Sequence, residues 1–265
     1  MPDSAARAGR VIRVVKSVLR LYPLLVVLLF WQGLAHSGLV PPRLFPDLGL
    51  IGAAIVDFVA SGDFLYHSLF TLQRAFIAFA IAVPSGILLG TLLARSRIFE
   101  MLVEPIFAFG YPIPKIALFP IFVFIFGLGS PSKVALAALE ALYPITLSTY
   151  YGVRSAEKTL IWAAESMGGN QRRIFWRVLL PSAAPYIFSS LRIGMHVALI
   201  VIILLEIIGD TTGLGFYVTY ASASYKYPSF FAGIAAIMLW GFLLDQITIH
   251  LRDRVVFWQS DKSRV

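Results

Sequence analysis

The apolar residues of this chain come in long runs that are separated by short polar segments. A helix that crosses a membrane needs about 20 mostly apolar residues, because it spans roughly 30 Å of hydrocarbon at about 1.5 Å per residue. The pattern predicts an all-α integral membrane protein. Its six transmembrane helices are expected over residues 21–40, 69–94, 102–126, 133–153, 185–208 and 230–251. Residues 1–20 then form a basic N-terminal segment, and residues 252–265 form a C-terminal tail.

The third apolar run, 102–126, is interrupted by polar residues and by prolines. It contains Glu104, Lys115 and the four prolines Pro105, Pro112, Pro114 and Pro120. Proline lacks the backbone N–H that a helix interior needs, and its ring clashes with the preceding turn. We therefore expect a broken or kinked helix whose polar groups face protein rather than lipid.

Composition agrees with a membrane protein. Hydrophobic residues make up 58% of the 265 residues and charged residues only 14%, whereas soluble domains carry roughly 25% charge. A water-soluble globular protein is therefore excluded. The chain has no cysteine, which excludes disulfides, thiolate metal sites and cysteine nucleophiles.

The formal net charge of +8 indicates an orientation in the membrane. With the N-terminus inside, 16 of the 22 Lys and Arg lie in cytoplasmic segments, while only Arg43, Lys133 and Lys226 lie outside. Positive charge concentrates in cytoplasmic loops of membrane proteins, so both termini are predicted to be cytoplasmic. The charge thus reflects topology and contact with anionic lipid, and no nucleic-acid partner is expected.

A cleaved signal peptide is an alternative reading of the first 37 residues. A basic region precedes the apolar stretch 24–35, and Ala35-His36-Ser37 loosely resembles a cleavage site. We favour a retained span, because the basic region is long and six spans place both termini on the same side.

The sequence lacks the common catalytic motifs. It contains no phosphate-binding G-x-x-x-x-G-K-[ST] loop, no H-E-x-x-H pair and no G-x-S-x-G elbow, so we predict no catalytic residue and no metal site. Any ATP and Mg must be bound by a partner chain. The chain itself is expected to bind no cofactor.

Charged residues inside spans are costly and are therefore functional candidates. Arg74, Glu104 and Arg192 lie near span ends, where a long side chain can reach the interface. For Glu140 and Glu206 two roles remain open, one in the translocation path or gate and one in a structural ion pair. For Asp245 we favour a structural role. We expect His196 to form an interhelical hydrogen bond rather than to ligate a metal. The candidate path or gate residues are Glu140, Glu206, Arg74, His196 and Arg192.

Two loops are long enough to be structured. The outer loop 37–66 contains an amphipathic stretch at 50–58 that predicts a helix lying against the membrane surface. The inner loop 154–184 contains small residues and a basic cluster, and Pro181 and Pro185 bracket its return to the membrane.

Residues 162–181 of the inner loop read W-A-A-E-S-M-G-G-N-Q-R-R-I-F-W-R-V-L-L-P. Aligned on its Ala-Ala pair, its glycine and its final Leu-Pro, this segment resembles the E-A-A…G…I-x-L-P loop of permease subunits of binding-protein-dependent ABC importers. The wider chain resembles the nitrate, taurine, aliphatic sulfonate and bicarbonate branch. Supporting stretches include Tyr111-Pro112-Ile113-Pro114, Phe126-Gly127-Leu128-Gly129, and Glu206 followed by Gly213-Leu214-Gly215. One residue departs from the motif: Trp162 occupies the position of the opening acidic residue.

The resemblance implies a type I ABC importer permease fold and a set of partners. It implies that loop 154–184 forms a coupling helix in a groove of a cytoplasmic ABC ATPase, through Ala163, Ala164, Gly168, Arg172, Arg173, Leu180 and Pro181. It also implies a periplasmic or lipid-anchored solute-binding protein docked on 37–66 and 209–228, and a second copy of the chain. The location would be the bacterial plasma membrane.

The implied function is uptake of a small anionic or zwitterionic solute, such as a sulfonate, taurine, nitrate or bicarbonate, by alternating access. Three alternatives remain open. One is a permease for a vitamin precursor such as a pyrimidine or a riboflavin-like solute. The others are a membrane subunit of an energy-coupling-factor system or ABC exporter, and a structural or redox membrane subunit.

Overall fold

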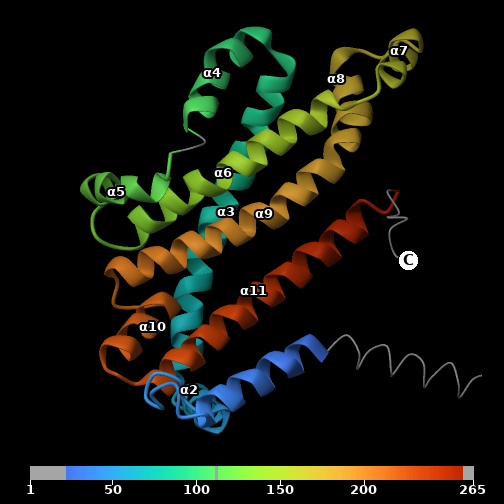
Figure 1. Ribbon diagram of the computed structural model, residues 1–265. Helices are drawn as coiled ribbons and strands as arrows, with labels where there is room; N and C mark the ends of the chain where they lie inside the picture. The colour runs from blue at the N-terminus through green and yellow to red at the C-terminus, as the bar shows by residue number, and fades with distance from the viewer. Residues whose placement is uncertain (1–21, 111–112, 259–265) are drawn as a thin grey trace, which may run out of the picture.

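The computed structural model describes residues 22–110 and 113–258, and helices dominate these residues (Figure 1). The predicted basic segment 1–20 and the end of the tail lie outside the described residues. The first described helix is Tyr22–His36. It is followed by α2 (Leu48–Ala60), α3 (Asp63–Arg95), α4 (Arg97–Gly110), the 3₁₀ turn η1 (Lys115–Leu118), α5 (Phe119–Phe126), α6 (Ser130–Arg154), α7 (Lys158–Ser166), α8 (Gln171–Ile174), the π-helical turn η2 (Phe175–Leu179), α9 (Leu180–Gly209), α10 (Leu214–Ala223) and α11 (Tyr227–Val255).

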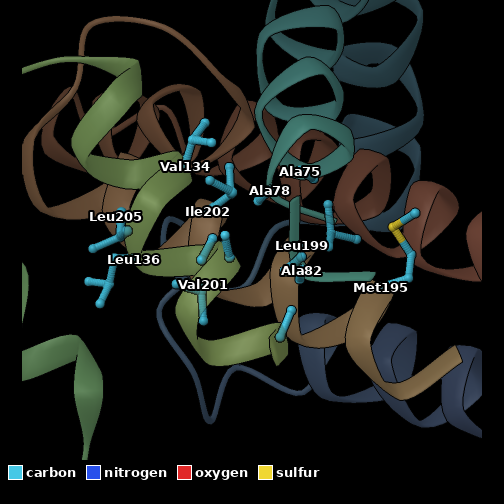
Figure 2. Packing of buried hydrophobic residues seen from close by; sticks show 14 of the residues in the cluster. Ala75, Ala78, Ala82, Val134, Leu136, Met195, Leu199, Val201, Ile202 and Leu205 are labelled. Carbon is cyan, nitrogen blue, oxygen red and sulfur yellow. The ribbon is translucent and has the colours of Figure 1, made fainter. Parts of the chain in front are cut away.

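The core lies where α6 packs between α3 and α9 (Figure 1). One face of α3 carries only small buried residues at helical spacing, namely Ala75, Ala78, Ala82, Gly86 and Gly90. Ile145 of α6 lies against this face at Gly86. Leu136 of α6 and aliphatic side chains of α9, such as Leu199 and Ile202, belong to the same buried cluster (Figure 2). In a membrane, helices associate through such close packing, because lipid gives no hydrophobic drive between them.

Two glycines on α3 set how closely the helices approach. A Cβ at Gly90 would lie 2.5 Å from the carbonyl oxygen of Thr146, and one at Gly86 would lie 2.8 Å from the side chain of Ile145. Backbone cannot move aside as a flexible side chain can, so α3 and α6 pack at this distance only with glycine at position 90.

Three helical segments in the described part of the chain are long and apolar enough to cross a membrane. They are α3, the continuous run from α8 through α9, and α11. Together, α4 and η1–α5 add a fourth if the bent pair is counted as one span. These segments contain the predicted spans 69–94, 185–208, 230–251 and 102–126. The prediction of a broken third helix is supported, because the axes of its two halves, Arg97–Gly110 and Lys115–Phe126, differ by 93°. Residues 111–112 between them are outside the described residues.

Two of the six predicted spans do not correspond to helices that are long and apolar enough to cross a membrane by length and composition alone. The helix Tyr22–His36 is short, and the predicted start of its span lies outside the described residues. Helix α6 is long enough, but it is less apolar because it carries Lys133, Glu140 and the polar run Thr146, Ser148 and Thr149. Most of these polar side chains face neighbouring helices, which explains why a hydropathy pattern alone is weak here.

The structured loops lie at opposite ends of the bundle (Figure 1). Helices α7 and α8, which form the inner loop 154–184, stand at one end together with the end of α11. Helices α2 and α10 lie at the other end. Helix α2 spans Leu48–Ala60 and therefore confirms the helix predicted over 50–58. Segments 37–66 and 209–228 thus share one end of the molecule, as the family resemblance implied (Figure 1).

Candidate functional site

Arg74 is the centre of a buried charged network near the end of the bundle that carries α2 and α10. Its side chain comes from α3 and is only 5% exposed. The Nη1 atom lies 2.8 Å from Oε1 of Glu206 and 2.9 Å from Oδ2 of Asp210. Nη2 donates to the Thr212 hydroxyl at 2.8 Å, and Nε donates to the Ser130 hydroxyl at 2.9 Å. Every side of the guanidinium is therefore engaged, as a buried cation requires.

Glu206 connects this network to the loop that follows α9. Its Oε2 accepts a hydrogen bond from the Thr71 hydroxyl at 2.8 Å and from the Gly215 amide at 3.1 Å. Thr71 in turn accepts from the Leu214 amide at 2.8 Å. Gly213 has φ +101°, and a Cβ at Gly215 would lie 2.4 Å from the Ile203 carbonyl oxygen. The Gly213-Leu214-Gly215 sequence is therefore required for the loop to fold back onto Glu206.

Asp210 and Lys133 complete the network, which has two positive and two negative side chains. The Lys133 Nζ lies 3.0 Å from Asp210 Oδ2, and Lys133 is only 1% exposed. Burial alone would raise the pKa of Asp210, but the Thr211 amide, Lys133 and Arg74 outweigh it and lower the pKa below its usual range. The four charged side chains therefore form ion pairs that join α3, α6 and the end of α9. We call this cluster of Arg74, Glu206, Asp210 and Lys133 the outer network.

A second charged pair lies halfway along α6. Lys115 of η1 has its Nζ 3.5 Å from Oε2 of Glu140, and the same Nζ sits 4.1 Å from the centre of the Tyr143 ring. Both charged side chains are largely buried. The pair thus ties the break between α4 and α5 to α6 by an ion pair and a cation–π contact.

A third cluster joins α9 to α11. Arg192 donates from Nε and Nη2 to the two carboxylate oxygens of Asp245 at 2.5 and 2.9 Å. His196 Nε2 lies 3.5 Å from Asp245 Oδ1, and its Nδ1 lies 2.7 Å from the Arg192 carbonyl oxygen. The hydrogen bond of His196 thus lies within α9, while its contact with Asp245 reaches α11, and the interhelical hydrogen bond stays a prediction. About half of the Arg192 side chain is exposed, in contrast to the outer network.

The inner loop is a helix, a tight turn and a second short helix. Helix α7 ends in a Schellman motif, in which the Gly169 amide donates to the Ala164 carbonyl and the Gly168 amide to the Glu165 carbonyl, both at 2.9 Å. Gly168 has φ +76°, the left-handed conformation that this motif places at its glycine. Asn170 then caps α8, because its Oδ1 accepts from the Arg173 amide at 2.8 Å. Gly168 is thus the residue that reverses the chain.

Three of the seven predicted contact residues of this loop line an open groove. The groove, of about 350 Å³, is lined in part by Ala163, Ala164, Val178, Pro181 and Trp258. Ala163, Arg172 and Arg173 are exposed, and Leu180 is half-buried. The Arg95 guanidinium of α3 lies 5.2 Å from the centre of the Phe175 ring in this loop. Ala163, Ala164 and Pro181 thus share one groove, while the other four residues lie elsewhere along the same loop.

The structure corrects one interpretation of the charged residues. Arg74 does not reach out to the interface, because the loop after α9 folds over it and supplies Thr212 and Asp210. Lys133, which was counted with the outer segments, is buried beside Asp210. Asp210 was missed as a candidate, although its position four residues after Glu206 places both on one face of a helix. The candidates Arg74 and Glu206 contact each other, whereas Glu140 and the pair Arg192 and His196 belong to separate clusters.

Comparison with known proteins identifies the class of protein to which this chain belongs. The model of the family described as "Binding-protein-dependent transport system inner membrane component" matches residues 82–256, and the chain belongs to this family. It is therefore the membrane permease component of an ABC importer and not its ATPase. This membership excludes the alternatives of an exporter subunit and of a redox subunit.

Individual relatives carry different solute names. The chain is 31% identical over 243 residues to the taurine transport system permease protein TauC of Escherichia coli, covering 90% of this chain and 88% of the relative. It is 32% identical over 236 residues to the formylaminopyrimidine transport permease protein ThiX of Halalkalibacterium halodurans, covering 89% and 94%. A crystal structure of an amino acid ABC transporter with histidines matches with TM-score 0.61 at 18% identity, covering 76% of this chain and 97% of the other, and shows the shared fold.

Proposed function

We propose that two copies of this chain form the membrane path of an ATP-driven importer, which moves a small anionic or zwitterionic solute into the cytoplasm by alternating access. In this arrangement each copy crosses the membrane six times, with both termini in the cytoplasm of a bacterium. The helix Tyr22–His36 and helix α6 supply the first and fourth spans. Helix α6 can cross despite its polar residues because α3 and α9 cover them.

The observation that carries the proposal is the construction of loop 154–184. Its helix–turn–helix stands at one end of the bundle (Figure 1). Its groove is lined mostly by small and apolar residues, together with Arg177. Small side chains at 163 and 164 allow a close backbone approach by a partner. Exposed Arg172 and Arg173 add positive charge beside the groove. Each of these features suits docking into a surface of the cytoplasmic ATPase, which binds ATP and Mg.

The opposite end provides the surface for a solute-binding protein. Helices α2 and α10 lie together there, and a pocket of about 250 Å³ is lined in part by Asp57, Asp63, Tyr217, Tyr220 and Lys226. Tyrosine is enriched in protein contact surfaces, whose rims are polar. The proposed binding protein docks on this end and delivers solute to the path between the two copies.

A second solute class deserves a test because of the relatives. TauC is named for taurine and ThiX for formylaminopyrimidine, and both are similar to this chain at almost the same identity. A vitamin-precursor solute is therefore the second candidate. Uptake of radiolabelled taurine and formylaminopyrimidine into cells that carry or lack the chain separates the two.

Gly168→Leu tests the coupling loop. A leucine in the left-handed conformation costs about 1–2 kcal/mol, because its Cβ meets the following carbonyl oxygen. We expect the variant to insert normally into the membrane. It should then either no longer copurify with the ATPase or hydrolyse ATP without uptake of solute. The matched control is Gly127→Leu, since Gly127 also has positive φ and open space around it but lies between α5 and α6. Unchanged uptake by Gly168→Leu would refute the coupling role.

A further inference from the structure

Arg192, Asp245 and His196 form a charged cluster between α9 and α11, inside the two spans predicted over 185–208 and 230–251. Arg192 follows the first residue of its predicted span by 7 positions, or about 10 Å along the helix. Asp245 precedes the last residue of its predicted span by 6 positions, or about 9 Å. With roughly 30 Å of hydrocarbon to cross, both groups lie inside the hydrocarbon region, about a third of the way from its inner face.

This cluster is open on one side, unlike the other two. The Arg192 side chain is 49% exposed, while the charged side chains of the outer network and of the Lys115–Glu140 pair are at most 20% exposed. Ile193 and Ile200 on α9, and Met238 and Phe242 on α11, are also exposed. Hydrocarbon cannot solvate a guanidinium, so the open side of the cluster must face water or protein.

The hydrogen bonds within the cluster leave specific groups unused. Asp245 occupies Nε and Nη2 of Arg192, which leaves the Nη1 donors directed away from the carboxylate. The carbonyl oxygen of Arg192 can only accept, so the proton of His196 sits on Nδ1. In the neutral imidazole, Nε2 is then an acceptor placed 3.5 Å from the acceptor Oδ1 of Asp245. Oδ1 also accepts from Arg192 Nε, whereas Nε2 of this imidazole has no donor among the described residues.

We propose that this cluster is a solute-binding subsite for a small zwitterion within the translocation path, an inference that rests on the proposed function. The solute's sulfonate or carboxylate binds the free Nη1 donors of Arg192. Its ammonium group binds beside Oδ1 of Asp245 and Nε2 of His196, and supplies the donor that Nε2 lacks. A simple anion engages Arg192 but leaves Nε2 without a donor and Asp245 without a cationic solute group, so the site distinguishes a zwitterion from an anion of the same size.

The test uses matched solutes on the complex purified with its ATPase from native membranes. Binding of radiolabelled taurine and β-alanine is measured by equilibrium dialysis in the absence of a binding protein. Their controls are isethionate and 3-hydroxypropionate, in which a hydroxyl replaces the ammonium group. We expect each zwitterion to bind at least tenfold more tightly than its hydroxyl analogue.

Three variants separate a binding site from a structural ion pair. Arg192→Gln should lose binding of all four solutes, and Asp245→Asn should bind a zwitterion no more tightly than its hydroxyl analogue. The exchanged pair Arg192→Asp with Asp245→Arg restores an ion pair but reverses the site, so it should not restore binding. Full binding by Arg192→Gln, or restoration by the exchanged pair, would overturn the subsite.

Failure of the subsite differs from failure of the proposed function. If the wild-type complex contains an active ATPase but binds neither zwitterion more tightly than its analogue, the subsite is wrong and the importer proposal stands. If no ATPase copurifies with the chain, the importer proposal is wrong and the subsite is rejected with it.

Discussion

Replacing Glu206 by glutamine should destabilise the protein strongly, although the two side chains have nearly the same shape. Glu206 is 1% exposed, and both of its oxygens face donors: Oε1 accepts from Arg74, and Oε2 accepts from Thr71 and Gly215. In glutamine one of the two becomes an NH₂ donor. Either orientation then places a donor against a donor and removes the charge that balances Arg74.

The size of the effect follows from what remains. Removing one partner of a buried ion pair costs about 3–5 kcal/mol, and the lower end applies because Arg74 keeps Asp210 at 2.9 Å. For a chain of this length, a loss of 1 kcal/mol in the free energy of unfolding lowers the melting temperature by roughly 2–4 °C. A loss of about 3 kcal/mol should therefore lower the apparent melting temperature by about 6–12 °C. Fluorescence-detected size exclusion after heating of the purified protein in detergent, at one fixed heating time, measures this shift.

The matched control is Glu165→Gln on exposed α7, which removes the same charge at a surface position. Such surface substitutions change stability by about 0.5 kcal/mol or less, so the control should melt within about 2 °C of the wild type. If Glu206→Gln melts as close to the wild type as this control does, the outer network does not stabilise the fold and the reasoning from its contacts is wrong.

Two further substitutions test other parts of the account. Gly215→Ala should lower the apparent melting temperature, because the new Cβ would lie 2.4 Å from the Ile203 carbonyl oxygen and overpacking costs about 1–3 kcal/mol. The control is Gly241→Ala, because a Cβ at Gly241 in α11 meets open space. Equal melting temperatures of the two variants would contradict the prediction. Trp162→Ala should weaken binding to the purified ATPase at least tenfold, since Trp162 is 61% exposed beside exposed Leu160 and Met167 and acts as an apolar anchor. The control is Phe124→Ala, which removes an exposed aromatic side chain in α5 and should leave the affinity for the ATPase unchanged when it is measured by surface plasmon resonance. An affinity for the ATPase that falls with salt but is the same without Trp162 would refute an apolar anchor.

Local features of this protein could be predicted from the sequence because they depend on neighbouring residues. The long apolar runs predicted α3, α9 and α11, and the prolines between 105 and 120 predicted the break between α4 and α5. The glycine at 168 predicted a turn in the inner loop, because few other residues adopt the left-handed conformation. Each of these features requires only the composition of a short segment.

The pairing of charged groups could not be predicted, because it joins residues that are far apart in the chain. Arg74 and Glu206 are separated by 132 positions, and their contact requires α3 and α9 to pack at a particular rotation. Burial of Arg74 further depends on the loop after α9, which folds over it and brings Thr212 into contact. The span predicted over 133–153 is a helix, α6, although it is less apolar than α3, α9 and α11, since a polar helix can lie between two others when its polar side chains are satisfied there.

The most direct test of the central claim is affinity purification of the tagged chain from its native membrane, with mass spectrometry of the proteins that copurify. The account predicts a P-loop ATPase in about equal amount, retained by the Gly127→Leu variant and lost, or uncoupled from uptake, in the Gly168→Leu variant. Recovery of the chain without any ATPase would contradict the assignment of residues 154–184 as the coupling loop of an importer.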